Sequence, residues 1–358
     1  MRPLFHPQLV NGPFGDPALY VECLHQRRAL LFDAGELQGF PPGKLLKVTH
    51  VFVSHTHMDH FIGFDHLVRL MLGRPKTLRV FGPAPILDQV IARLASYSWN
   101  LVEGYGERLV LEVTQVREGS LERVILDCAE RFRDPGVREV RPFDGCLCRD
   151  PFFVVRAVLL DHKLPSMGFC LEETRHIQIL KTKLEDLGLR PGPWLRGLRE
   201  AILHGEGEGL PIEVEPRHKG PVPLGRLLEH AVRISPGQRI AYVVDAGYCE
   251  ANRQRVLSLA RGADILFIEA AFLRADQDRA EATSHLTAFQ AGRLASEAAV
   301  KRAVPFHFSP KYSPDPRRLL EEMNEGLRGP CEEAGEGWCE AQGQRASPHD
   351  GDRGPKIR

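Results

Sequence analysis

One short segment, Ser54–His60, constrains this chain more than any other, because it places three histidines and one aspartate directly after the apolar run Val51–Val53. Side chains two residues apart on an extended segment point the same way, so His55 and His57 can share one metal ion. Asp59 and His60 lie where a helix is expected to begin, at a different angle, and can serve a second ion. Neutral imidazoles and a carboxylate suit Zn²⁺ or a similar divalent ion. The alternative, a polar loop with ordinary histidines, does not account for so dense a cluster.

Further candidate ligands follow other apolar runs. His162 follows Val154–Leu160, Asp245 follows Ile240–Val244, and His307 follows Val304–Phe306. Each residue alone would more often be a cap or a surface group, but loops at strand ends commonly carry function. Together with the first loop they complete two metal sites: His55, His57 and His162 in one, Asp59, His60 and His307 in the other, with Asp245 bridging.

The apolar runs also predict the fold class. Short runs bounded by Gly and Pro predict strands, at 19–24, 29–32, 48–53, 78–81, 109–116, 152–160, 239–244 and 264–268. Helical patterns predict helices at about 60–72, 84–97, 251–261, 286–300 and 316–326. The order has no regular alternation of strand and helix, so we expect an α/β protein whose sheets are covered by helices, not a doubly wound fold.

Two segments differ from the rest in composition. Residues 174–236 are rich in Gly and Pro around a short helical stretch near 176–187, and they look like an insertion, which is usually functional or disordered. Its part 175–199 holds six Lys or Arg against two acidic residues, although the whole chain balances 47 basic against 47 acidic residues. The stretch 329–358 is rich in Gly and Glu and poor in apolar residues, so we expect a disordered tail.

The chain shows no sign of export or membrane insertion. Its first residues lack the apolar stretch of a signal peptide, and no run of about 18 apolar residues occurs. The eight cysteines include no Cys-x-x-Cys pair, and we expect them to be reduced thiols. We therefore expect a cytoplasmic protein.

The motifs resemble those of a known superfamily. The segment His55–His60 has the His-x-His-x-Asp-His pattern of the metallo-β-lactamase superfamily. Within it the chain resembles ribonuclease Z, the endonuclease that trims tRNA 3′ trailers, through four further segments: His162–Phe169, Pro191-Gly192-Pro193, Ser284–Thr287 and Phe306–Tyr312. The resemblance implies a four-layer αβ/βα sandwich over residues 1–328 with residues 174–236 as an inserted arm. It also implies two divalent metal ions, Zn²⁺ first, with Mn²⁺ or Fe²⁺ accepted by the same ligands.

The resemblance assigns roles to particular residues. Asp59 would orient the attacking water, and Glu269 with His285 would deliver a proton to the leaving oxygen. A residue that only starts a helix is the alternative for His285. Precursor tRNA would be gripped by the arm, and a homodimer is implied because the family's arm acts across one. The arm residues expected to contact RNA are Lys181, Lys183, Arg190, Gly192, Pro193 and Arg196.

Two other functions stay open. Segments around Glu36, Asp245 and Glu269 depart from the ribonuclease Z pattern, which leaves room for a hydrolase of the same fold acting on a smaller phosphodiester, such as a cyclic nucleotide, or on another ester. A non-catalytic metal-binding or RNA-binding module would be expected to have lost ligands, and none of the seven is missing. Deletion of residues 176–230 separates the tRNA enzyme from the smaller-substrate hydrolase, and an assay of precursor tRNA cleavage with and without a chelator is the most informative single experiment.

Overall fold

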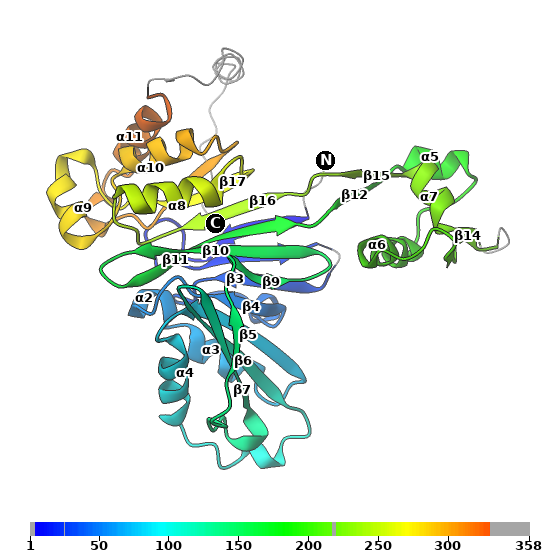
Figure 1. Cartoon of the computed structure of the whole chain (residues 1–358), viewed down its shortest axis with the longest axis horizontal. Helices are drawn as coiled ribbons and strands as arrows, with labels where there is room; N and C mark the ends of the chain where they lie inside the picture. The colour runs from blue at the N-terminus through cyan, green and yellow to red at the C-terminus, as the bar shows by residue number, and fades with distance from the viewer. Residues whose placement is uncertain (1–3, 25, 217–219, 330–358) are drawn as a thin grey trace.

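Two sheets packed face to face form the centre of the protein (Figure 1). The structure is a computed structural model that describes residues 4–24, 26–216 and 220–329. One group of helices covers the outer face of each sheet. The expected four-layer αβ/βα sandwich is confirmed.

The first sheet has eight strands in chain order, β1 (Phe5–Leu9), β2 (Leu19–Cys23), β3 (Arg28–Phe32), β4 (Val48–Phe52), β5 (Lys76–Pro83), β6 (Leu109–Arg117), β7 (Ser120–Asp127) and β8 (Glu139–Pro142). Strands β3 to β6 run parallel, so their carboxyl ends meet at one edge. The helices on its outer face are α1 (Pro42–Leu45), α2 (Met58–Phe61), α3 (Phe64–Met71) and α4 (Ile86–Ala95).

The second sheet has six strands in the order β18–β17–β16–β11–β10–β9. Their bounds are β9 (Cys146–Arg149), β10 (Phe153–Asp161), β11 (Pro165–Glu173), β16 (Arg239–Val243), β17 (Ile265–Glu269) and β18 (Ala303–Phe306). Helices α8 (Glu250–Ala260), α9 (Gln277–Thr283), α10 (Ala288–Glu297) and α11 (Arg317–Leu327) lie on its other side. Strands β16, β17 and β18 are parallel, which again brings their carboxyl ends to one edge.

Alternating apolar side chains build the layers. On β3, Leu31 faces the helices, whereas Leu30 and Phe32 face the second sheet, as the period of two along a strand requires. Between the sheets the rings of Phe32 and Tyr242 lie 5.9 Å apart, one contact of a larger aromatic layer. Each fully buried side chain of this kind contributes roughly 1.5–3 kcal/mol, so this layer holds the two sheets together.

Two local features explain where helices begin and pack. Thr287 and Gln290 form a capping box at the start of α10, which satisfies free backbone N–H groups there. Gly292 of α10 lies so close to α11 that an added Cβ would come within 2.2 Å of the Met323 carbonyl oxygen. Only glycine fits at that helix crossing.

The segment 174–236 forms an arm with a small core of its own (Figure 1). It contains β12 (His176–Ile179), α5 (Lys181–Asp186), α6 (Trp194–His204), β13 (Pro211–Ile212), β14 (Val222–Pro223), α7 (Leu224–Ala231) and β15 (Val232–Ser235). The expected helix near 176–187 is wrong in its first part, because residues 176–179 pair as a strand with β15. Strands β12 and β15 continue β11 and β16 away from the sandwich, so the arm leaves from the amino end of β16.

The other differences from expectation are small. The helical pattern at 60–72 is divided between α2 and α3, with Gly63 as the N-cap residue of α3. Gly63 packs so closely that an added Cβ would lie 2.1 Å from the Gly35 carbonyl oxygen. The expected disordered tail lies, apart from Gly329, outside the described residues. Across the described parts of the chain, no helix is long and apolar enough to cross a membrane.

Candidate metal centre

The candidate ligands gather where the strand ends of the two sheets meet. His55 follows β4, and the loop after it leads into α2, which carries Asp59 and His60. His162 follows β10, Asp245 follows β16, and His307 follows β18. Because these strands run the same way at the shared edge, residues far apart in sequence come together there. Both three-residue sites predicted from the sequence are present as clusters, one of which includes Asp245.

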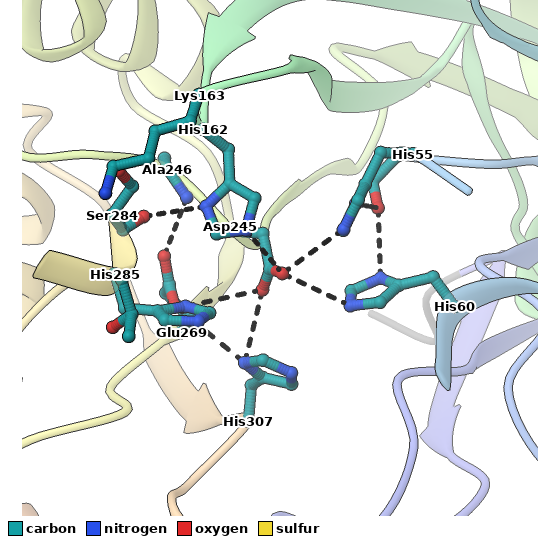
Figure 2. A network of polar contacts seen from close by, with 12 residues as sticks. His55, His60, His162, Lys163, Asp245, Ala246, Glu269, Ser284, His285 and His307 are labelled. Atoms are coloured by element: carbon teal, nitrogen blue, oxygen red, sulfur yellow. Dashed lines mark hydrogen bonds and ion pairs between the residues drawn. The ribbon is translucent and has the colours of Figure 1, made fainter. Parts of the chain in front are cut away.

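Asp245 lies at the centre of these clusters (Figure 2). Its Oδ2 is 3.4 Å from Nε2 of His55, 3.4 Å from Nε2 of His60 and 3.3 Å from Nε2 of His162. Its Oδ1 is 3.2 Å from Nδ1 of His307. One carboxylate oxygen therefore faces histidines of both predicted sites, which is the position expected of a bridging ligand.

The remaining two ligands complete the clusters. The Oδ2 of Asp59 lies 3.5 Å from Nε2 of His60 and 3.6 Å from Nε2 of His307. The ring of His57 lies 4.3 Å from that of His55 and 5.5 Å from that of His162, centroid to centroid. Asp59 and His57 are also the more exposed members, so the centre opens to solvent on their side.

Hydrogen bonds on the far ring nitrogens hold the histidines in orientation. The Nδ1 of His162 donates to the Ser284 carbonyl oxygen at 2.8 Å, which leaves its Nε2 to face Asp245. The Nδ1 of His60 lies 3.0 Å from Oδ2 of Asp33, and Nδ1 of His55 lies 3.1 Å from the Ser54 hydroxyl. Such partners fix the orientation of metal-binding imidazoles.

Burial and neighbouring charges together shift the pKa values of the ligand side chains at the centre. Burial, and to a smaller extent neighbouring His60, lower the pKa of His55 to about 2. Burial opposes a charge on His60 too, but Asp245 and Asp33 outweigh it and raise its pKa to about 10. Burial alone would raise the pKa of Asp245, yet His307 and His60 hold it well below the usual range. The ionised carboxylate of Asp245 therefore stabilises positive charge at this point of the fold, either on a neighbouring ring or on a bound cation.

Unpartnered buried atoms test whether these residues fit metal ions. Among the described residues, Nε2 of His55, Nε2 of His60, Oδ1 of Asp245 and Nδ1 of His307 are buried and form no hydrogen bond. A buried polar atom without a partner costs about 1–3 kcal/mol, and here four such atoms share one small region. Imidazole nitrogens and carboxylate oxygens are ligands of divalent ions such as Zn²⁺, so the donor set fits the metals that the sequence predicted.

Glu269 and His285 form a hydrogen-bonded pair that also contacts two ligands, His285 facing Asp245 and Glu269 facing His307 (Figure 2), so that the four residues make a third cluster able to hold a metal ion. The Nδ1 of His285 donates to Oε2 of Glu269 at 2.7 Å, and the other oxygen of Glu269 accepts the Ala246 N–H at 2.8 Å. Burial disfavours a charged ring, but Glu269 outweighs it and raises the pKa of His285. The ring is therefore oriented by a fully buried carboxylate.

The sequence analysis did not identify the residues that hydrogen-bond the ligands and hold them in place. Asp33 is completely buried and accepts hydrogen bonds from the Ser54 N–H at 2.6 Å and the Tyr242 hydroxyl at 2.8 Å, besides its contact with His60. It directly follows β3, so the strand-end rule that found the ligands would have found it as well. Asp33, Asp245 and His307 have φ of 56°, 49° and 57°, a conformation that is uncommon for residues other than glycine.

The expected RNA-binding residues lie elsewhere. They are confined to the arm, around α5 and the start of α6, and none of them joins the candidate metal clusters. Lys181, Lys183, Arg190 and Arg196 are exposed. Gly192 lies against the Glu215 side chain, whose carboxylate would be 2.5 Å from an added Cβ. The structure thus separates the candidate chemical site from the basic surface.

This fold and site define a member of the β-lactamase superfamily, and a model described as the β-lactamase superfamily domain matches residues 204–308. The ribonuclease Z of Deinococcus radiodurans is 30% identical to this chain over 85% of the chain and 90% of the relative. That of Methanosarcina mazei is 31% identical over 82% of both. The chain belongs to the ribonuclease Z family, and with it to the metal-dependent hydrolases. The resemblance seen in the sequence is confirmed.

A solved structure supports the fold independently. A metallo-β-lactamase fold protein of Bacillus subtilis, YhfI, is 16% identical, covers 89% of this chain and 92% of its own length, and superimposes with a TM-score of 0.50. At that identity the likeness concerns the fold alone. It agrees with the sandwich described above.

Proposed function

We propose that this chain is an endoribonuclease that cuts the 3′ trailer of precursor tRNA by metal-dependent hydrolysis. One observation carries the proposal: the ligand set converges on Asp245 in a chain whose relatives at 30% and 31% identity are ribonucleases Z. The exposed basic residues of the arm support an RNA substrate, because cations on a surface bind phosphate backbones.

The metal ions would be held by the residues assigned from the sequence. His55, His57 and His162 would hold one ion, Asp59, His60 and His307 the other, and Asp245 both. The imidazole-rich donor set favours Zn²⁺. Two bound divalent ions lower the pKa of a water molecule and neutralise charge on a phosphodiester.

The protein's own groups would orient water and supply a proton. The Asp59 carboxylate is partly buried, which alone would raise its pKa, but His307 and His60 lower the pKa to about 2. It is therefore an ionised acceptor that can orient the attacking water. Glu269 raises the pKa of His285, which favours the protonated ring, whose Nε2–H would be donated to the leaving oxygen.

A homodimer is part of the proposal. The arm leaves from the amino end of β16, whereas the metal centre lies at the carboxyl end. An arm directed away from its own centre is better placed to hold RNA for the centre of a second copy. Sedimentation at equilibrium gives the mass directly, and a monomer at assay concentrations would contradict this part.

The test uses the purified protein and a tRNA with a 3′ extension. We expect one endonucleolytic cut in the extension, loss of cutting after treatment with a chelator, and recovery when Zn²⁺ or Mn²⁺ is restored. No cut in the metal-loaded protein would exclude the proposal. Hydrolysis of a small phosphodiester without cleavage of tRNA would favour the alternative, which the solvent-open side of the centre at His57 and Asp59 supports.

A further inference from the structure

We propose that Asn252 of α8 is a positioning residue of the metal centre, which fixes the loop carrying His162 against the loop carrying Asp245. The inference rests on the metal site proposed above and extends it to a residue that has no contact with the ligands' metal-facing atoms. Asn252 carries a polar amide side chain, which is uncommon in a protein core, and the residue is only 2% exposed. A buried amide needs a full set of partners, since each unsatisfied polar group costs free energy.

The amide of Asn252 joins two loops through three hydrogen bonds. Its Oδ1 accepts the Asp161 N–H at 2.9 Å, and its Nδ2 donates to the Asp161 carbonyl oxygen at 2.8 Å. The same Nδ2 donates to the Gly247 carbonyl oxygen at 2.8 Å. The Gly247 N–H in turn donates to the Asp161 carbonyl oxygen at 2.9 Å, which closes the network.

These contacts lie next to two ligands. Asp161 directly precedes His162, and Gly247 follows Asp245 by two residues. Nε2 of His162 and Oδ2 of Asp245 are 3.3 Å apart, so a small shift of either loop changes the separation of two ligand atoms. A residue that fixes both backbones therefore controls the geometry of the centre.

The sheet cannot do this by itself. Strand β11 lies between β10 and β16, so the strands that end at His162 and Asp245 share no ladder of hydrogen bonds. Both loops also leave regular geometry, with φ of 61° at Lys163 and 49° at Asp245. One backbone hydrogen bond, from the Gly247 N–H to the Asp161 carbonyl oxygen, joins the two strand ends, and Asn252 adds three more that fix their relative position.

The chemistry of the network requires asparagine. It calls for one acceptor and two donors in a single planar group of this length. Aspartate offers only acceptors when ionised, and alanine offers neither. Asn252→Asp keeps the shape but places an anion against two carbonyl oxygens, whereas Asn252→Ala removes all three bonds.

A purely structural role for Asn252 is the competing explanation, and a matched variant separates the two. Val256 lies one turn along the same helix, is 1% exposed, and packs in the apolar core under the second sheet. Val256→Ala should lower the stability of the metal-free protein without touching either ligand loop. Gln254→Ala, an exposed change on the same helix, is the neutral control.

The experiment measures metal binding in the full chain. Zn²⁺ affinity is determined by competition with a chromophoric chelator, and ligand geometry by the visible spectrum of the Co²⁺-loaded protein. We expect Asn252→Ala and Asn252→Asp to weaken affinity by roughly 10–100-fold, as loss of groups behind metal ligands does, and to alter the Co²⁺ spectrum. Val256→Ala and Gln254→Ala should leave both measurements as in the wild type.

The outcomes keep the inference separate from the proposed function. Wild-type protein that binds no metal would overturn the metal site and this inference together. Wild-type protein that binds metal, with Asn252 variants matching Val256→Ala in affinity and spectrum, would overturn the inference alone. If Asn252→Ala does not fold, Asn252→Asp, which keeps the side-chain volume, decides the matter by the same two measurements.

Discussion

At the carboxyl end of β16 the candidate ligands come from four separate parts of the chain, whereas the arm at its amino end is a single continuous segment. The metal centre depends on the packing of both sheets, because strands of each one place its ligands. The arm has its own small core and joins the sandwich through the β12–β15 ribbon. Changes in the arm should therefore affect RNA binding alone, while changes at the centre should stop all hydrolysis.

The largest expected effect is at the centre. Asp59→Ala should lower hydrolysis of both precursor tRNA and a small phosphodiester on the order of 10³-fold, because an ionised acceptor for the attacking water is lost. The fold should survive, since this carboxylate is 45% exposed. Initial rates on both substrates check this. Met58→Ala, at the exposed neighbouring residue, should keep full activity, and full activity in Asp59→Ala would refute the role of Asp59.

Removing the arm should give the opposite pattern. Glu173 and Gln238 lie opposite each other, with the Glu173 N–H donating to the Gln238 carbonyl oxygen at 2.8 Å. A two-residue Asn-Gly turn in place of residues 174–237 would close the β11–β16 hairpin. We expect precursor tRNA cleavage to fall about 10²-fold as phosphate contacts are lost, with the small phosphodiester hydrolysed as before. Unchanged tRNA cleavage would show that the arm has no part in it.

Mixing the two variants tests whether an arm serves a second copy. The Asp59→Ala chain has an arm without a working centre, and the shortened chain has a centre without an arm. If subunits exchange, mixed dimers should cleave precursor tRNA tens of times faster than either variant alone. Rates that equal the sum of the separate variants would mean that each arm serves its own chain.

The sandwich should also respond to pH through His50 of β4. Burial of the ring, with smaller effects of Arg79 and Arg28, lowers its pKa to about 3, against about 6.5 in an unfolded chain. Between these values the unfolded chain binds one more proton, so stability falls with falling pH by up to about 1.4 kcal/mol per unit. Urea unfolding of metal-free protein at pH 7 and pH 5 should show a smaller difference in His50→Leu than in the wild type. Equal differences would contradict the assignment.

The smallest effect belongs to single charges on the arm. Arg190→Ala should weaken tRNA binding a few-fold and reduce the salt slope of the binding constant by about one. Lys183 already lies 3.1 Å from the Asp186 carboxylate, so Lys183→Ala should do less. Filter binding over a range of salt concentrations measures both, and a weaker affinity with an unchanged slope would exclude a phosphate contact.

The sequence was most informative where an apolar run ended in a ligand-type residue. That rule located His162, Asp245 and His307, because parallel strands bring their carboxyl ends to one edge. The apolar runs also predicted sheets covered by helices, because most of the central strands are continuous apolar runs, whereas the four-layer sandwich was implied by the family resemblance. Strands β7 and β8, at one end of the first sheet, gave no such signal, because their residues are largely half-exposed or exposed.

Other features have no local signature. The side chain of Asn252 contacts backbone atoms of residues up to 91 positions away. No local sequence pattern around Asn252 predicts these contacts. In the arm the helical pattern near 176–187 predicted α5, but Gly and Pro obscured α6 and α7, which are stabilised by packing in the small core of the arm. Long-range partners, not local preference, decide both cases.

The division of the ligands between the sheets has one more consequence. His60 belongs to the half of the chain that builds the first sheet, and Asp245 to the half that builds the second. A metal ion held by both would cross-link the two halves of the sandwich, as a disulfide joins two segments. At a free concentration 100 times the dissociation constant it would add about 2.7 kcal/mol to the free energy of unfolding. Resistance of the whole sandwich to denaturant should therefore rise with the supply of metal.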